Sequence, residues 1–128
     1  MPNSTLYLEW LHKASDDELN AQSILRHRDG TPNGVCVFSQ QTAEKYLKGL
    51  LVYHGIEFSK THDLVEIATI LRSEHQDIDT LKEDEDYLTR LYIKIRYPAD
   101  APDRSWTEAE QAFAAAVRIK EFVLGKIK

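Results

Sequence analysis

The sequence predicts an all-α fold in a single domain that spans residues 1–128. Apolar residues recur at steps of three and four in several segments, and capping or turn-forming residues separate these segments. No segment alternates between apolar and polar residues between hairpin turns. The length of 128 residues suits one domain, and a hydrophobic content of 42% is enough for a core. We therefore expect four long helices and one short helix, antiparallel where the loops are short.

The first helix is predicted from about Leu6 to Arg28, before a strong turn signal at residues 29–34. Alternating steps of four and three define a packing seam: Trp10, Ala14, Asp17, Ala21 and Ile24. The carboxylate of Asp17 either lies in water at the edge of this seam or faces inward and pairs with Lys45 or Arg96. We favour the pairing, because an unpaired carboxylate in the interior costs free energy.

The second helix is predicted from about Gly34 to His54, and Gly55 is a natural helix stop. One broad side of the helical wheel carries its core positions: Val35, Thr42, Ala43, Tyr46, Leu47, Leu50, Leu51 and Tyr53. Four polar residues lie opposite, within an arc of roughly 100°: Gln41, Glu44, Lys45 and Lys48. The simplest interpretation of these four is a solvated face with a favourable pair between Glu44 and Lys48.

A short helix is predicted after the loop at residues 55–60. Thr61 can cap this helix, and Asp63 suits the positive end of its dipole. Its buried face comprises Leu64, Ile67, Ala68 and Leu71. His62 has two interpretations, and we favour the first: it holds the loop through a hydrogen bond, or it carries protons or binds phosphate.

The fourth helix is predicted from about Asp77 to Ile95, and it ends near Arg96 because Pro98 disfavours helical geometry in the preceding residue. Its acidic run, Glu83 to Asp86, is most simply a solvated face. The cation of Arg96 either complements the helix dipole or contacts an anion.

The last helix is predicted to begin at Ser105 or Thr107, because each starts a capping box with a glutamate three residues later. Its apolar face continues to the end of the chain: Ala109, Phe113, Ala116, Ile119 (or Lys120) and Val123.

The middle of the chain reads QQTAEKYLKGLLVYHGIEFSKTHDL, and Arg96-Tyr97-Pro98 follows later. This combination resembles the HEPN domain family, whose usual pattern is Q-x-x-E-K-x-x-K, a short loop, T-H-D-L and then R-Y-P. The resemblance extends into the first helix and departs from the family at Glu18, where Leu is expected. It implies an up-and-down antiparallel four-helix bundle with one additional short helix, and usually a homodimer.

The resemblance also implies a function: a nucleotide- or RNA-binding component that acts with a small nucleotidyltransferase in a toxin–antitoxin-type module. Many HEPN proteins are metal-independent ribonucleases in which Arg, four to six residues and then His form the catalytic motif. No arginine here has a histidine at that distance downstream, so the usual ribonuclease motif is absent. The candidate ligand-binding residues are Gln41, Glu44, Lys45, Lys48, His62, Asp63 and Arg96, because two lysines one turn apart can hold a phosphate.

Two alternatives stay open. A divergent ribonuclease toxin would use His62, Arg96 and Tyr97 in place of the usual pair. A protein-interaction module would need an exposed apolar patch, for which four residues are candidates, although each suits the core equally well: Tyr87, Tyr92, Tyr97 and Trp106.

The composition narrows these functions further. A formal net charge of −5 argues against broad affinity for nucleic acid but allows a local basic site. Cys36 is the single cysteine, which fits a reducing cytoplasm, where we expect the protein. The sequence has no apolar run long enough to cross a membrane and no signal-peptide pattern. Neither H-x-x-x-H, C-x-x-C nor a Gly-rich phosphate loop occurs, so we expect no metal and no cofactor.

Overall fold

The computed structural model describes residues 5–96 and 103–127, with the side chains of residues 93–96 excepted. Its elements in chain order are α1 (Leu6–His27), α2 (Pro32–Tyr53), α3 (Leu64–Leu71), the 3₁₀-helix η1 (Gln76–Leu81), α4 (Lys82–Arg96) and α5 (Trp106–Lys126). The described residues form helices and no strands, which confirms the predicted all-α class.

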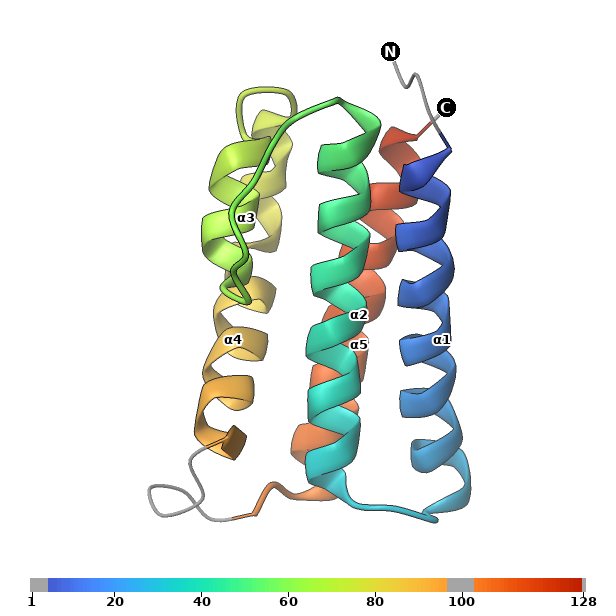
Figure 1. The fold of residues 1–128 in the computed structure, drawn as a ribbon. Coiled ribbons are helices and arrows are strands. Elements are labelled where there is room, and N and C mark those ends of the chain that lie inside the picture. The colour runs from blue at the N-terminus through green and yellow to red at the C-terminus, as the bar shows by residue number, and fades with distance from the viewer. Residues whose placement is uncertain (1–4, 97–102, 128) are drawn as a thin grey trace.

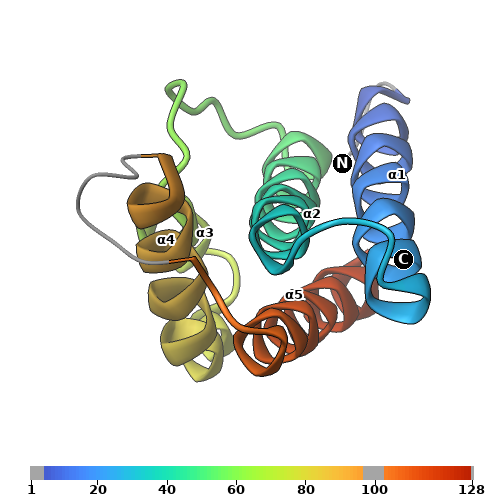
Figure 2. The ribbon, with the colours of Figure 1, turned by 90° about the horizontal axis from the view of Figure 1, so that it is seen from below.

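The four long helices run alternately up and down (Figure 1). Helix α2 occupies the centre, with α1 on one side and α4 on the other, and α5 crosses behind it (Figures 1 and 2). The short helix α3 packs against both α2 and α4. This arrangement is the predicted antiparallel bundle with one additional short helix. It leaves one long face of α2 turned away from α5, toward the viewer of Figure 1.

The core is built around the apolar side of α2, where Leu47, Leu50 and Leu51 are fully buried. Helix α1 approaches this side closely at Gly49. A Cβ atom on Gly49 would lie 3.0 Å from Cδ2 of Leu11 and 3.3 Å from Cβ of Trp10. The absence of a side chain at this position therefore lets the two helices pack together at short range.

The predicted packing seam of α1 is confirmed, and so is the inward orientation of its acidic residue. Ala14, Asp17 and Ala21 are buried. The carboxylate of Asp17 accepts a hydrogen bond of 2.5 Å from Nζ of Lys45 on α2. This ion pair satisfies the buried charge and links the first two helices.

Several helix boundaries differ from the sequence-based expectation. Helix α2 begins at Pro32, because the Thr31 side chain caps it by accepting a hydrogen bond from Gly34 N. The N-cap of α3 is Asp63 and not Thr61, and its carboxylate accepts hydrogen bonds from the amides of the next turn. The fourth predicted helix is divided into η1 and α4. Ser105 caps α5 in the predicted capping box.

The structure decides which residue of α5 is buried and corrects the predicted solvated face of α4. On α5, Ile119 is fully buried, whereas Lys120 is half-buried and its Nζ donates a hydrogen bond to Glu18. On α4, the acidic run is not uniformly solvated, because Glu85 is only 2% exposed. Glu85 follows Leu81 by four residues and precedes Leu88 by three, so the helical period turns its side chain inward with theirs.

Candidate functional site

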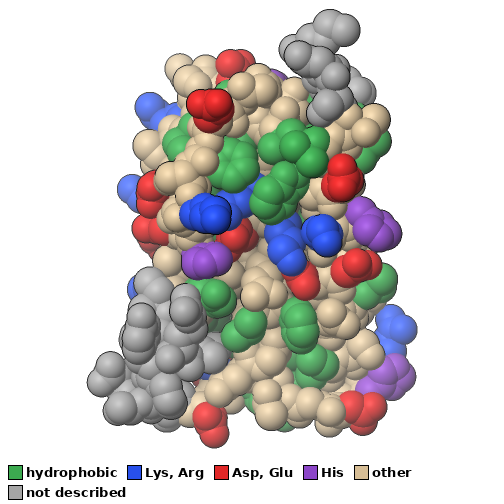
Figure 3. Space-filling model, in the orientation of Figure 1, with side chains coloured by type: hydrophobic (Ala, Val, Ile, Leu, Met, Phe, Trp, Pro, Cys, Tyr) green, Lys and Arg blue, Asp and Glu red, His purple; other side chains and the backbone are tan. Residues whose placement is uncertain are grey.

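The candidate site lies on the face of α2 that α5 does not cover. Lys and Arg side chains gather across the middle of this face, below a group of hydrophobic side chains (Figure 3). We use the name basic band for two exposed lysines beside the Trp10 and Phe58 side chains, Lys13 and Lys60. Lys13 lies one turn after Trp10 on α1, and Lys60 lies in the loop between Phe58 and His62. Both lysines are exposed, and neither forms an ion pair within residues 5–92 and 103–127. The protein is acidic overall, so the basic band is a local feature.

Beneath the band, three polar side chains form a row along α2. Gln40, Glu44 and Lys48 are spaced four residues apart and therefore lie above one another on the helix. Gln40 is fully buried, and Glu44 and Lys48 are each only 6% exposed. The predicted solvated face is thus wrong for Glu44 and Lys48, which form an ion pair of 2.9 Å inside the protein.

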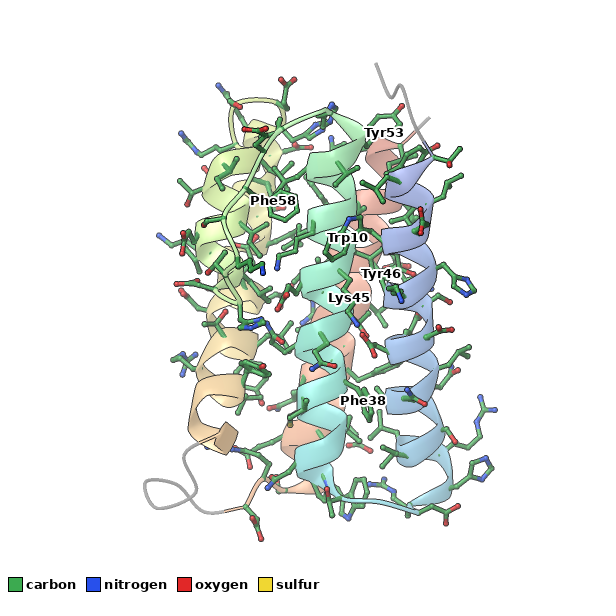
Figure 4. All side chains as sticks on the ribbon, viewed as in Figure 1. Trp10, Phe38, Lys45, Tyr46, Tyr53 and Phe58 are labelled. Carbon is green, nitrogen blue, oxygen red and sulfur yellow. The ribbon has the colours of Figure 1, made fainter. Side chains whose placement is uncertain are left out.

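Two aromatic side chains cover this ion pair. Trp10 extends from α1 and Phe58 from the loop after α2, so that their rings meet across α2 (Figure 4). The ring centroids are 6.1 Å apart in an edge-to-face arrangement. Nζ of Lys48 lies 5.9 Å from the Trp10 ring and 5.7 Å from the Phe58 ring. These distances allow a cation–π attraction, which helps to compensate for the loss of water around the ammonium group.

The Glu44 carboxylate is the centre of a polar cluster in which Gln40, Glu44 and Lys48 are buried and His62 is exposed. Its Oε2 accepts from Lys48 Nζ, and its Oε1 accepts from Gln40 Nε2 at 3.1 Å and pairs with His62 Nδ1 at 2.9 Å. Burial by itself raises the pKa of Glu44, but the hydrogen bonds from Lys48, His62 and Gln40 together lower it below its ordinary value. Glu44 is therefore held as a carboxylate.

The ionised Glu44 fixes the orientation of His62. A carboxylate can only accept, so Nδ1 of His62 carries the proton in this contact, which leaves Nε2 on the side of the ring away from Glu44. The side chain of His62 is 58% exposed, and its ring lies 5.6 Å from that of Tyr92. Gln40 Nε2 also donates to the carbonyl oxygen of His62 at 2.9 Å. The sequence-based interpretation of His62 as a residue that holds the loop by a hydrogen bond is confirmed.

The remaining predicted site residues are dispersed. Lys45 lies between α1 and α2 with its ammonium group on Asp17 (Figure 4), and Gln41 is half-buried one turn before it. Asp63 caps α3 and so uses its carboxylate within the fold. Arg96 is the last residue of α4, but its side chain and all of Tyr97 lie outside the described residues. The predicted meeting of His62 with Arg96 or Tyr97 therefore stays a prediction.

Sequence reasoning does not identify Gln40, Trp10 and Phe58 as parts of this site. The spacing of four residues between Gln40 and Glu44 could have indicated that their side chains are neighbours on the helix. A helical wheel centred on the charged residues assigns Gln40 no role. No local pattern links Trp10 to Phe58, because these two residues lie far apart in the chain and meet only through the packing of α1 on α2.

The apolar patch predicted for a protein-interaction module does not form from the proposed aromatic residues that the structure describes. Tyr87, Tyr92 and Trp106 are each half-buried. The exposed large hydrophobic side chains among the described residues are instead Leu6, Leu8, Leu19 and Leu124.

Two further properties of the described residues bear on function. No group of three or more His, Cys, Asp and Glu side chains within residues 5–92 and 103–127 is arranged to hold a metal ion. None of the described helices combines the length and apolar character needed to span a membrane.

Comparisons with known proteins agree on one family. The model of the HEPN domain matches residues 7–127. The crystal structure of TT1696 from Thermus thermophilus is similar, with 28% identity, a TM-score of 0.85 and coverage of 97% of this chain and 100% of that chain. The crystal structure of ST0689, described as an archaeal HEPN homologue, has 29% identity, a TM-score of 0.73 and coverage of 95% and 98%. No curated protein matches the sequence. With the family's pattern present in α2 and at the start of α3, the chain belongs to the HEPN domain family.

Proposed function

We propose that this HEPN domain protein binds a nucleotide or single-stranded RNA on the face that carries the basic band. The observation that supports this proposal is the juxtaposition of Lys13 and Lys60, which form no ion pair within the described residues, with the half-buried rings of Trp10 and Phe58. Lysines attract phosphate groups, and aromatic rings stack on bases of any sequence.

The polar cluster and the Asp17–Lys45 pair have a supporting role in this proposal. Because the ammonium groups of Lys45 and Lys48 are already paired with carboxylates, they supply little free positive charge. The two ion pairs and the Glu44–His62 contact instead fix the positions of α1, α2 and the loop after α2 relative to one another. The phosphate contacts are therefore assigned to the exposed lysines, together with His62.

The wider biological setting is proposed from the family resemblance. HEPN proteins of this small type act beside a small nucleotidyltransferase in toxin–antitoxin-type modules, usually as homodimers. We propose the same assembly for this chain, in the cytoplasm.

Binding is tested by titrating ATP and a short labelled single-stranded RNA against the wild type and the double variant Lys13→Glu/Lys60→Glu. We expect the variant to bind RNA at least about tenfold more weakly, and its salt dependence (log K against log salt) to be shallower by about 1.4, since each lost phosphate contact contributes about 0.7. The matched control is Arg26→Glu/Lys82→Glu, which makes the same change in net charge at the last turn of α1 and the first residue of α4. Equal weakening in both double variants would reject the assigned face.

A second candidate function is RNA cleavage without a metal, and the Glu44–His62 contact favours it. In this reaction Nε2 of His62 accepts the proton of a ribose 2′-hydroxyl. The 2′-oxygen then attacks the adjacent phosphorus. The bond to the 5′-oxygen breaks, that oxygen takes a proton from solvent, and a 2′,3′-cyclic phosphate remains. A carboxylate that orients a histidine in this way is a common arrangement around general bases.

Cleavage is tested by incubating the protein with labelled RNA in the presence of EDTA. If His62 is the base, wild type cleaves and His62→Ala loses at least about 100-fold in rate, because general base catalysis typically contributes that much. The control His12→Ala removes a histidine that is 80% exposed on α1 and should leave the rate unchanged. Absence of cleavage by the wild type would eliminate this candidate.

A further inference from the structure

A second region of the protein, separate from the basic band, contains an unusual carboxyl group. Glu85 lies in the first turn of α4 and is only 2% exposed. Its Oε2 is buried and has no hydrogen-bond partner, and no hydrogen bond to its other oxygen forms within the described residues. A buried polar atom without a partner is costly, so an isolated group of this kind calls for an explanation.

Glu85 lines a cavity of about 380 Å³ between α3, η1 and α4. We call this space the α3–α4 cavity. Val65, Ala68 and Ile78 supply its apolar wall, and the charged groups of Arg72, Asp79 and Lys82 surround it together with Glu85. A cavity of this size, with an apolar wall and a few convergent polar groups, is typical of sites for small ligands or single side chains.

The lining of the cavity favours a hydrogen-bond donor over an acceptor. The guanidinium of Arg72 is compensated, because its Nε donates to both oxygens of Asp79 at 3.1 and 2.9 Å. Arg72 and Asp79 therefore leave little net charge between them, and Lys82 and Glu85 are the two remaining charged side chains of the lining. Of these two, Glu85 presents a buried oxygen that lacks a donor, so an N–H group that enters the cavity finds an acceptor there.

We propose that the α3–α4 cavity binds an organic cation, an ammonium or guanidinium group, that forms an ion pair with the Glu85 carboxylate. The cation can belong to a free polyamine or to a Lys or Arg side chain of a peptide. Its N–H groups would satisfy the unpaired carboxyl oxygens, and its alkyl stem would pack on Val65 and Ile78.

Binding of such a cation is coupled to loss of a proton. Burial, with the neighbouring carboxylates, raises the pKa of Glu85 to about 8. At pH 7 the carboxyl group is therefore protonated in about nine-tenths of the molecules. A cation binds the ionised form, so that each binding event displaces up to about 0.9 proton into solution.

The test uses isothermal titration of the full chain at pH 7 with spermidine and, separately, with N-acetyl-arginine amide, each in two buffers of different ionisation enthalpy. We expect saturable binding of either compound, with release of about 0.5–0.9 proton. Tighter binding of spermidine would identify a polyamine as the source of the cation, and tighter binding of N-acetyl-arginine amide would identify a peptide side chain. Glu85→Gln should weaken binding at least about tenfold and abolish the proton release, because glutamine keeps the shape of the protonated side chain but cannot ionise.

The matched control is Glu83→Gln, which removes an exposed carboxylate from the same turn of α4. It should change the affinity less than about threefold and leave the proton release intact. Equal weakening in both variants would indicate a non-specific effect of net charge and overturn the proposal. Binding without proton release, or no binding of either compound at millimolar concentration, would overturn it as well. None of these outcomes depends on whether the basic band binds RNA.

Discussion

The substitution Glu44→Ala is expected to lower the free energy of unfolding by about 3–5 kcal/mol, because it leaves the buried ammonium group of Lys48 without its counter-charge. Gln40 and His62 lose their acceptor in the same variant. For a domain of this size the expected fall in Tm is roughly 10–20 °C. Denaturant unfolding monitored by circular dichroism measures the loss. Lys48→Ala should produce a similar loss, since it leaves the carboxylate of Glu44 buried without its ammonium partner.

Two controls separate this effect from the general cost of removing a salt bridge. Arg72→Ala breaks a pair whose side chains are 58% and 56% exposed, and it should cost less than about 1 kcal/mol. The double variant Glu44→Leu/Lys48→Met removes both charges and should recover most of the stability lost in either single variant. Single variants at Glu44 and Lys48 that cost no more than Arg72→Ala would show that the pair does not organise the face.

The substitution Glu85→Gln is expected to stabilise the protein increasingly as the pH rises. The pKa of Glu85 is about 8 in the folded chain, against an ordinary value of 4.5. The folded state therefore binds the proton more strongly, and stability falls as the pH rises from 4.5 through 8. By pH 7 the wild type has lost about 3 kcal/mol of stability in this way. Glutamine does not ionise, so the variant avoids this loss.

The measurement is the free energy of unfolding of both proteins at about pH 5, 7 and 8.5, which bracket the titration of the folded chain. The gain from Glu85→Gln should be small at the lowest pH and largest at the highest. The exposed control Glu83→Gln should show no comparable trend. A gain for Glu85→Gln that is the same at all three pH values would mean that Glu85 ionises normally in the folded protein.

The contrast between Glu85 and the exposed Glu83 and Asp86 shows why the sequence-based interpretation of the acidic run is wrong at Glu85. Four consecutive acidic residues look like one solvated segment when composition alone is considered. The helical period, however, turns one of the four toward Leu81 and Leu88. The period is visible in the sequence, but only the packing of α3 and η1 against α4 excludes water from that position.

The sequence by itself determined the helical class, the order of the long helices, the capping box of α5 and the family, because these depend on local spacing and on side chains that bond to their own backbone. It also predicted the inward Asp17, since a charge within an apolar seam needs a partner. Only the tertiary structure decided which polar residues of α2 are buried. The loop after α2 brings Phe58 and His62 over Glu44 and Lys48 while Trp10 covers them from α1, and burial of this kind depends on contacts between residues far apart in the chain.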